Sequence, residues 1–366
     1  MARIALISDV HLGTRQYGIQ ERYEDFLEAF RKFGNAMEEH RPDAVIIGGD
    51  LFDSPRPDAK SVFTAKEVVK RIKNAGIPVY GIDGNHDLAD GYWLRTIGAE
   101  IFDHGVVDVV DIAGVKVGGI NYRNGRDLVE EIGRMADSGM KMDALVAHFA
   151  LAEMNGGGSA DTGVRELSPL LDKLGVKYML MGHVHIPDAR KWNGVLYVNP
   201  GSTEMKSSNE PREKYWFMLD TDTHEATPVR LYTRPVEDVD IATEEDLLEF
   251  QGRLNADMVA GKEKLTFYQV VASDDIEDGF KRIAKSVHDS SALARIVMRS
   301  GKSRDVAPVV DRAESVATLE SAIEARFPKD SDEAKLISSM LHSPDPSSIH
   351  LICQKFMEGE SQTTQA

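Results

Sequence analysis

Five short polar motifs in this chain each follow directly on a run of mainly apolar residues. The motifs are Asp9-Val10-His11 after residues 3–8, Gly48-Gly49-Asp50 after 44–47, Gly84-Asn85-His86-Asp87 after 79–82, His148 after 144–147, and Gly182-His183-Val184-His185 after 178–181. Short apolar runs bounded by turn residues are typical of buried strands. In open α/β sheets, ligands collect beyond the carboxyl ends of the strands. The sequence therefore predicts an α/β fold that gathers these motifs into one site.

Helical patterns separate the first strands. Apolar residues recur at helical spacing after the first strand (Tyr23, Phe26, Leu27, Phe30 and Phe33) and after the second (Val62, Val68, Val69 and Ile72). The second helix is expected to end at Gly76, before Pro78. Alternation of strand and helix implies crossover connections, so we expect a largely parallel layer.

Later strands occur as pairs joined by short turns. The pairs are 106–110 with 115–120, 189–192 with 195–198, and 215–219 with 226–231. Asn193-Gly194, between the second pair, is a strong hairpin signal. We expect a second, antiparallel layer that packs on the first, giving an α/β sandwich.

The 366 residues exceed one typical domain. Motifs with metal-ligand residues end before Arg234-Pro235, where we expect a boundary. We expect three parts: a domain over 1–233, a small α+β module over 234–305, and a helical segment over 306–366 with a disordered tail from Ser361. The module is marked by residues 265–271, 280–287 and 294–298, and the helical segment by 334–341 and 349–357.

Composition excludes several classes of protein. The net charge of −17 rules out broad electrostatic attraction to nucleic acid, so a DNA-binding chain of this kind needs local basic patches, a partner protein or bound metal ions. Cys353 is the single cysteine, which excludes an internal disulfide and a cysteine-type zinc site. No apolar run approaches the roughly 20 residues of a membrane span, and the first residues lack the pattern of a signal peptide. We expect a cytoplasmic protein with no membrane partner.

The donor types in the motifs suit divalent metal ions. Carboxylate oxygen, amide oxygen and imidazole nitrogen together favour Mn²⁺, Fe²⁺ or Zn²⁺. A histidine near one strand end is more often structural than a ligand, but five such motifs in order indicate a shared site. Two ions roughly 3.5–4 Å apart, bridged by a carboxylate, are typical of enzymes that hydrolyse phosphate esters.

The five motifs resemble those of the calcineurin-like metallophosphoesterases, over roughly residues 3–230. The resemblance implies a four-layer α/β sandwich and two divalent ions, most readily Mn²⁺. It implies one ion held by Asp9, His11, Asp50 and His185, and another held by Asp50, Asn85, His148 and His183, with Asp50 bridging. His86 is then not a ligand but a catalytic group that protonates the leaving oxygen or holds the scissile phosphate.

Narrower motifs are similar to the SbcD / meiotic-recombination-eleven nucleases of double-strand-break repair. They are Asp9 to Gly13 followed by Arg22 to Phe26, Gly49 to Pro57, Asn199 to Glu204, and Thr233 to Val239. The resemblance implies a manganese-dependent exo- and endonuclease acting on DNA ends and single-stranded DNA. It further implies a capping module that touches DNA and a C-terminal segment that binds the coiled coil of an SMC-like ABC ATPase. We also expect a homodimer.

Asp53 departs from part of that family, in which a histidine at this position assists exonuclease action. We expect a catalytic contribution from Asp53 as a support for neighbouring groups, and the alternative is a carboxylate at a helix N-terminus. Cations near the motifs are further candidates for phosphate contacts, with ordinary surface charge as the alternative: Arg15, Arg22, Arg123, Lys206 and Arg212.

Two other functions remain open on the same scaffold. One is a phosphatase or small-molecule phosphodiesterase. Against it, Ser54 stands where protein phosphatases place an arginine, Phe149 stands where they place a glycine, and a long C-terminal extension is present. The other is a non-catalytic scaffold, against which none of the expected ligands is missing.

Overall fold

The computed structural model describes residues 2–88, 91–103, 107–154, 159–273, 276 and 278–299. Residues 1–299 form one compact unit. The helices expected over 334–341 and 349–357 and the cysteine, Cys353, lie outside the described residues.

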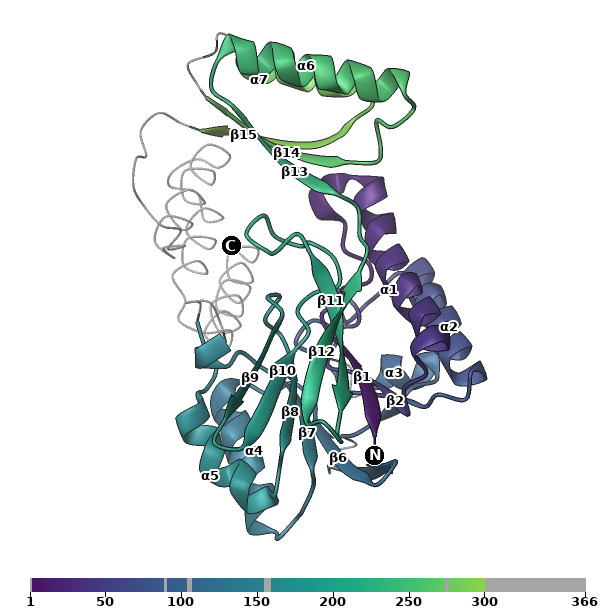
Figure 1. The fold of residues 1–366 in the computed structure, drawn as a ribbon, viewed down its shortest axis with the longest axis vertical. Helices are drawn as coiled ribbons and strands as arrows, with labels where there is room; N and C mark the ends of the chain where they lie inside the picture. Colours follow the sequence, from purple (N-terminus) through teal and green to yellow (C-terminus); the bar gives the residue numbers. More distant parts are fainter. Residues whose placement is uncertain are drawn as a thin grey trace, which may run out of the picture. The chain divides into compact units, whose positions relative to one another are not determined.

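The first of two six-stranded sheets has a parallel part and an antiparallel edge (Figure 1). Its strands, in spatial order, are β12 (Glu225–Leu231), β11 (Lys214–Asp220), β1 (Arg3–Ile7), β2 (Ala44–Ile47), β3 (Val79–Gly81) and β4 (Glu100–Ile101). Strands β1 to β4 pair in parallel, whereas β11 and β12 pair antiparallel. The last two strands of this domain therefore return to extend the sheet that the first strand begins.

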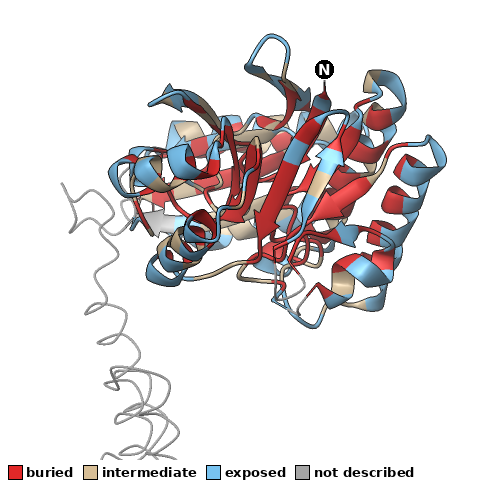
Figure 2. Ribbon diagram, turned by 90° about the horizontal axis from the view of Figure 1, so that it is seen from below, coloured by how far each residue is buried: buried red, intermediate tan, exposed pale blue. Residues whose placement is uncertain are grey.

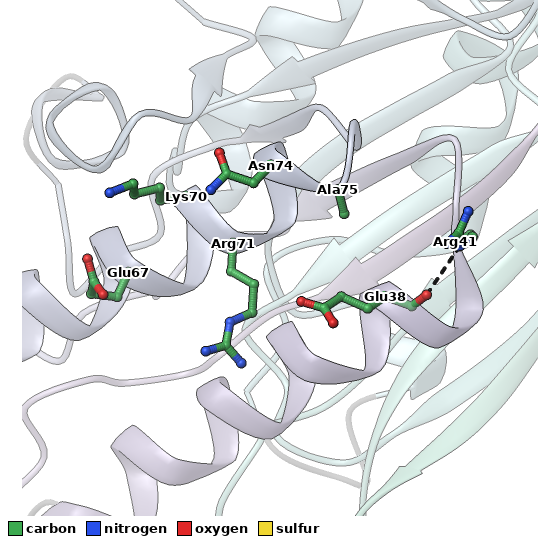
Figure 3. Close-up of a pocket in the computed structure, with 7 residues that line it drawn as sticks. All are labelled: Glu38, Arg41, Glu67, Lys70, Arg71, Asn74 and Ala75. Atoms are coloured by element: carbon green, nitrogen blue, oxygen red, sulfur yellow. Dashed lines mark hydrogen bonds between the residues drawn. The ribbon is translucent and has the colours of Figure 1, made fainter.

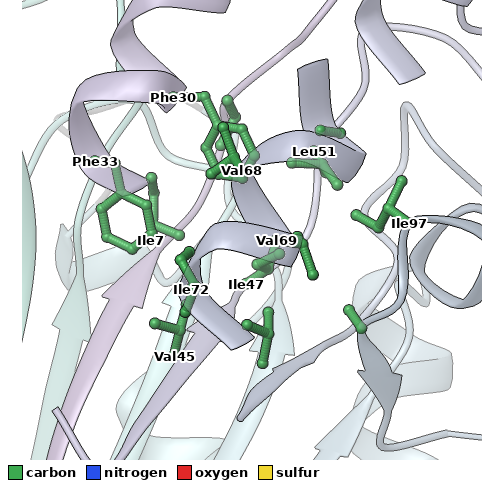
Figure 4. Packing of buried hydrophobic residues seen from close by; sticks show 14 of the residues in the cluster. Ile7, Phe30, Phe33, Val45, Ile47, Leu51, Val68, Val69, Ile72 and Ile97 are labelled. Carbon is green, nitrogen blue, oxygen red and sulfur yellow. The ribbon is translucent and has the colours of Figure 1, made fainter. Parts of the chain in front are cut away.

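Helices α1 (Gln20–His40), α2 (Ala59–Asn74) and α3 (Tyr92–Ile97) connect the parallel strands, and a short 3-10 turn, η1 (Gln16–Gly18), precedes α1. Figure 4 shows Phe30, Val68 and Ile72 of α1 and α2 packed with Val45 and Ile47 of β2. Asp58 caps α2, because its side chain accepts hydrogen bonds from the backbone N–H of Lys60 and Ser61. The apolar spacing that predicted these two helices is the spacing that covers this face of the sheet.

The second sheet also has a parallel centre. Its strands, in spatial order, are β5 (Val109–Ile112), β6 (Val115–Ile120), β7 (Ala144–His148), β8 (Tyr178–Gly182), β10 (Val195–Asn199) and β9 (Asp188–Trp192). Strands β6, β7, β8 and β10 are parallel, and only the edges are antiparallel hairpins. The expectation of an antiparallel second layer is wrong, because helices α4 (Gly125–Asp137) and α5 (Val164–Leu174) provide crossover connections between its central strands. A short 3-10 helix, η2 (Ala152–Met154), precedes α5.

The two sheets pack face to face. Ile4, Leu6 and Ile46 of the first sheet share one buried cluster with Val146 and Leu180 of the second. Helices cover the outer faces, and Figure 2 shows the buried strands between helices whose outer surfaces are exposed. The expected α/β sandwich of four layers, helix–sheet–sheet–helix, is confirmed.

A smaller module follows Thr233. It consists of β13 (Val236–Ile241), α6 (Glu244–Val259), β14 (Phe267–Ser273), α7 (Gly279–Asp289) and β15 (Leu293–Arg299), and its three strands are parallel. Strand and helix alternate along this module, whereas the expected α+β arrangement does not require such alternation. β13 and α6 had no sharp signal, since β13 carries the acidic residues Glu237, Asp238 and Asp240. The domain boundaries at 233 and 305 stay a prediction.

Charged and aromatic contacts join this module to α1 and η1. The Arg234 guanidinium donates to both carboxylate oxygens of Asp25 at 2.7 Å. The Tyr17 ring stacks on Phe267 with the centroids 5.8 Å apart. Within the described ranges, no helix combines the length and apolarity that crossing a membrane requires.

Candidate metal centre

The five motifs meet at the carboxyl ends of the parallel strands. Four of the expected ligands, Asp9, His11, Asp50 and His183, have positive φ, a backbone conformation uncommon outside glycine. The first two motifs are tied together, because the His11 N–H donates to the Asp50 carbonyl at 3.0 Å. Such strained backbone clusters at functional sites, where the surrounding structure holds it in place.

Glycines in the motifs make this packing possible. A Cβ on Gly84 would lie 2.1 Å from Asp50 Oδ1, and one on Gly182 would lie 1.9 Å from Ser8 Oγ. Neither position has room for any side chain, so the glycines of the third and fifth motifs are required by close approach.

The first donor group contains Asp9, His11, His185 and Asp50. The Nε2 atoms of His11 and His185 face each other at 3.1 Å. Asp9 Oδ1 lies 3.5 Å from His185 Nε2 and 3.9 Å from His11 Nε2. Asp9 and His11 are completely buried.

The second donor group contains Asn85, His148, His183 and Asp50. Asn85 Oδ1 lies 3.1 Å from His148 Nε2 and 2.9 Å from His183 Nδ1. Asp50 belongs to both groups, because its Oδ2 atom lies 3.4 Å from His148 Nε2 and 3.7 Å from His11 Nε2. The structure therefore brings all seven expected ligands together, and their division between two ions stays a prediction.

The donor sets fit divalent cations. Imidazole nitrogen binds such ions at about 2.0–2.1 Å, so two of them on one ion lie about 3 Å apart. His11 and His185 have this separation, and both Nδ1 atoms have other partners, Asp53 for His11 and Glu210 for His185. A cation that displaces the proton between these two Nε2 atoms would be held by both of them, and a mixed O and N donor set suits Mn²⁺, Fe²⁺ or Zn²⁺.

The electrostatics of the metal-free site point the same way. Burial acts to raise the pKa of Asp9, but a hydrogen bond with His185 and the charges of His148 and His11 outweigh it, so this pKa lies well below its usual range. Burial likewise opposes the ionisation of Asp50, and His148 more than compensates, which lowers the pKa of Asp50. Both carboxylates are therefore charged at neutral pH and available to cations.

Two of the histidines that are expected ligands have a hydrogen-bond partner at the ring nitrogen that faces away from the centre. His148 Nδ1 lies 2.8 Å from the Gly48 carbonyl oxygen, and His185 Nδ1 lies 2.8 Å from Glu210 Oε1. Partners of this kind fix which imidazole nitrogen faces a metal. Glu210 was missed in the sequence, because it belongs to no strand-end motif and is 25 residues from His185.

His86 lies beside the ligands but is more accessible than they are. Its backbone N–H donates to Asp50 Oδ1 at 2.8 Å, and its Nδ1 lies 3.1 Å from the Asp53 carbonyl oxygen. The side chain is 39% exposed, whereas that of His11 is fully buried. A carbonyl can only accept, so Nδ1 carries a proton and Nε2 is left for exchange with a substrate.

Asp53 contacts the first donor group from the side. Its Oδ1 lies 3.3 Å from His11 Nδ1 and 2.7 Å from Lys206 Nζ. Burial opposes its ionisation, but His11 and Lys206 outweigh burial and hold the pKa of Asp53 well below its usual range. The alternative as a helix N-terminal carboxylate is wrong, because α2 begins at Ala59 and Asp58 is its cap.

Only one of the five candidate cations contacts the centre. Lys206 Nζ lies 3.1 Å from His11 Nδ1 as well as beside Asp53. Arg22 is fully buried against Asp25 and Glu204, which excludes a phosphate contact. Arg212 pairs with Asp238 and Arg123 with Asp103, while Arg15 lies over the Tyr23 ring.

A hollow elsewhere on the surface is unrelated to this centre. It lies between α1 and α2, and Figure 3 shows its lining: Glu38, Arg41, Glu67, Lys70, Arg71, Asn74 and Ala75. It contains none of the expected site residues.

Comparisons with known proteins agree with the geometry. The family model described as calcineurin-like phosphoesterase matches residues 2–187. The chain is 29% identical to the DNA double-strand break repair protein Mre11 of Aeropyrum pernix over 261 residues, which cover 64% of this chain and 62% of the relative. It is 30% identical to the protein of that name from Haloferax volcanii, covering 69% of this chain and 58% of the relative. A shorter match, 44% identical over 82 residues, is to the Methanococcus maripaludis protein of the same name and covers 22% of each chain. The chain thus spans about three fifths of the first two relatives.

Proposed function

Because the chain belongs to the calcineurin-like phosphoesterase family, we propose that it is a manganese-dependent nuclease that hydrolyses phosphodiester bonds at DNA ends, as exo- and endonuclease, in double-strand-break repair. The observation that carries the proposal is one buried centre with two donor groups that share Asp50 and lie beside an accessible histidine. The relatives are DNA double-strand break repair proteins by name, which supports DNA as the substrate.

The residues divide into those that hold ions and those that act on the substrate. Asp9, His11, Asp50 and His185 would hold one ion, and Asp50, Asn85, His148 and His183 the other. Two such ions, when bound, polarise a phosphodiester and neutralise charge that develops on it. The protein holds the ligand atoms in place, and His86 lies beside Asp50, where a phosphate on the ions would be within its reach.

His86 is the candidate general acid. Its Nδ1–H is held by the Asp53 carbonyl, which orients the ring and directs Nε2 away from that loop. From Nε2 the imidazolium can give a proton to the departing oxygen of the cleaved ester. The Asp53 carboxylate takes a different part, since it accepts from Nδ1 of His11 and is itself paired with Lys206.

The test compares cleavage and metal content in one variant. His86→Ala should lower Mn²⁺-dependent cleavage of single-stranded DNA by about 10²–10⁴-fold, the usual contribution of a general acid. Metal analysis should still find two ions, because His86 is in neither donor group. His224→Ala, at an exposed position in the turn between β11 and β12, is the matched control and should cleave like the unmodified chain.

Three outcomes would contradict the proposal. Loss of metal together with activity would make His86 a ligand. An unmodified chain that binds no Mn²⁺ would remove the centre itself. Hydrolysis of small phosphate esters without cleavage of DNA would favour a phosphatase or small-molecule phosphodiesterase, the function that the net charge of −17 fits more readily.

We extend the proposal to partners. Residues 234–305 would contact DNA, residues 306–366 would bind the coiled coil of an SMC-like ABC ATPase, and the protein would act as a cytoplasmic homodimer. The net charge of −17 repels DNA, so a partner that contributes to DNA binding is consistent with this proposal. Truncation after Phe327 should abolish co-purification with the ATPase and leave Mn²⁺-dependent cleavage of short single-stranded DNA intact. Full-affinity binding of the ATPase by the truncated chain would place the partner surface elsewhere.

A further inference from the structure

Glu210 is a buried carboxylate that none of the five motifs contains. It lies in the loop between β10 and β11 and is 8% exposed. It accepts five hydrogen bonds: at Oε1 from His185 Nδ1 (2.8 Å) and the Ser207 N–H (2.9 Å), and at Oε2 from Ser202 Oγ (2.7 Å), Lys214 Nζ (2.7 Å) and the Lys206 N–H (3.2 Å). A carboxylate with this many donors is held in one orientation.

The charge of Glu210 is matched by an equally buried cation. Lys214, at the start of β11, is 1% exposed and donates to both Glu210 Oε2 and Ser202 Oγ. A buried ion pair stabilises a fold poorly, because desolvation of the two charges offsets their attraction. Stability alone therefore gives little reason for a carboxylate at this position.

The contact with His185 gives a better reason. A carboxylate can only accept, so Nδ1 of His185 is the donor and Nε2 faces the first donor group. Nε2 lies 3.1 Å from His11 Nε2 and 3.5 Å from Asp9 Oδ1, on the side away from Glu210. His148 in the second group has a neutral carbonyl, that of Gly48, in the corresponding place. The two donor groups therefore differ at this point: a charged carboxylate contacts Nδ1 of His185, whereas an uncharged carbonyl contacts Nδ1 of His148.

We infer that Glu210 is a positioning residue for His185, which fixes its Nδ1–H form and thereby sets the affinity of the ion site made by Asp9, His11 and His185. Lys214 and Ser202 hold the carboxylate in the orientation that this requires. The inference deepens the proposed function and rests on its two-ion centre. Partners of this kind typically change metal affinity by about 10–100-fold.

The decisive experiment uses two double variants of the full chain that differ in one acceptor atom. Glu210→Gln with Lys214→Met keeps an oxygen for His185, and Glu210→Met with Lys214→Met removes it at similar volume. Neither leaves an unpaired buried charge, so both should fold. Titration of each metal-free chain with MnCl₂ in a calorimeter should show one of two ions bound about 10–100-fold more weakly in the methionine variant than in the glutamine variant.

A purely structural role predicts another pattern. It would change the thermal unfolding of both variants and leave their Mn²⁺ affinities equal, and equal affinities would overturn the inference. If the double variants do not fold, Glu210→Gln and Glu210→Met are compared in the chain that keeps Lys214, which retains Ser202 as an acceptor. Weaker binding of one ion in the methionine variant supports the inference, and equal affinities overturn it. An unmodified chain that binds fewer than two ions would instead contradict the proposed centre.

Discussion

Asp50 is the residue on which both donor groups depend, since one of its oxygens lies near histidines of each group. Asp50→Ala should therefore remove more metal than Asn85→Ala, which affects the second group alone. Metal analysis after dialysis against Mn²⁺ measures this difference. Two ions retained in the Asp50→Ala protein would disprove the bridging role. The fold should persist in both variants, because these side chains lie on loops beyond the strand ends.

The ligand histidines also predict how metal affinity depends on pH. Burial disfavours the charged form of His148, but Asp50 and Asp9 outweigh it and raise its pKa to about 9. Burial is likewise outweighed at His185 by Asp9 and Glu210, and the pKa of His185 is also about 9. Below that pH an incoming ion must displace protons, so affinity should rise with pH.

Calorimetric titration with MnCl₂ between about pH 6 and about pH 8, in buffers of different ionisation enthalpy, measures both the affinity and the protons released. The expected result is proton release with an affinity that increases toward higher pH. An affinity that is constant or falls as the pH rises would contradict the raised pKa values.

At the scale of elements, α2 depends on the cap at its first turn. The Asp58 carboxylate accepts from the backbone of Lys60 and Ser61 and from the Tyr23 hydroxyl. Asp58→Ala should lower the free energy of unfolding by about 0.5–2 kcal/mol, the usual cost of losing such a cap. Asp58→Asn keeps an acceptor and should cost less. Urea-induced unfolding measures both.

The cap also has a pH dependence of known sign. Burial tends to raise the pKa of Asp58, but hydrogen bonds from Tyr23 and Ser61 outweigh it and lower this pKa from its ordinary value of 3.8. The stabilisation is therefore complete above pH 3.8 and is lost as the pH falls through the lower pKa of the folded state. The difference between the unmodified chain and Asp58→Ala should be constant from neutral pH down to that region and shrink below it. A difference that grows on acidification would contradict the sign.

At the scale of the whole molecule, Asp25 joins the second module to the first domain. Its carboxylate pairs with Arg22, which is fully buried, and with Arg234, at the start of the second module. Asp25→Ala leaves one buried and one partly buried guanidinium with fewer partners, and breaking such a site typically costs about 3–5 kcal/mol. Arg234→Ala leaves Asp25 paired with Arg22 and should cost less. Urea-induced unfolding of each variant and of the double variant gives the coupling free energy between Asp25 and Arg234. Equal losses of unfolding free energy in the two single variants would show that Asp25 stabilises the fold through Arg234 alone.

The sequence by itself determined the five strands that precede the motifs, the α/β class and the meeting of the seven expected ligands in one place. It did so because each motif is local: a short apolar run fixes a buried strand, and the polar residues after it must then emerge at the strand's carboxyl end. The first two helices were likewise predicted from apolar spacing within single segments. Even the Asn193-Gly194 hairpin needed only neighbouring residues.

Only the tertiary structure decided what depends on residues distant in the chain. The pairing of β10 with β8 makes the second sheet parallel at its centre, and no local pattern specifies that partner. Arg22 resembled a surface cation, but Glu204, 182 positions away, allows it to be buried. Glu210 was likewise identified only from the fold, which brings it to His185, 25 positions away. Burial of a charge is settled by the partner that compensates its desolvation, and that partner is supplied by the fold and not by the neighbouring sequence.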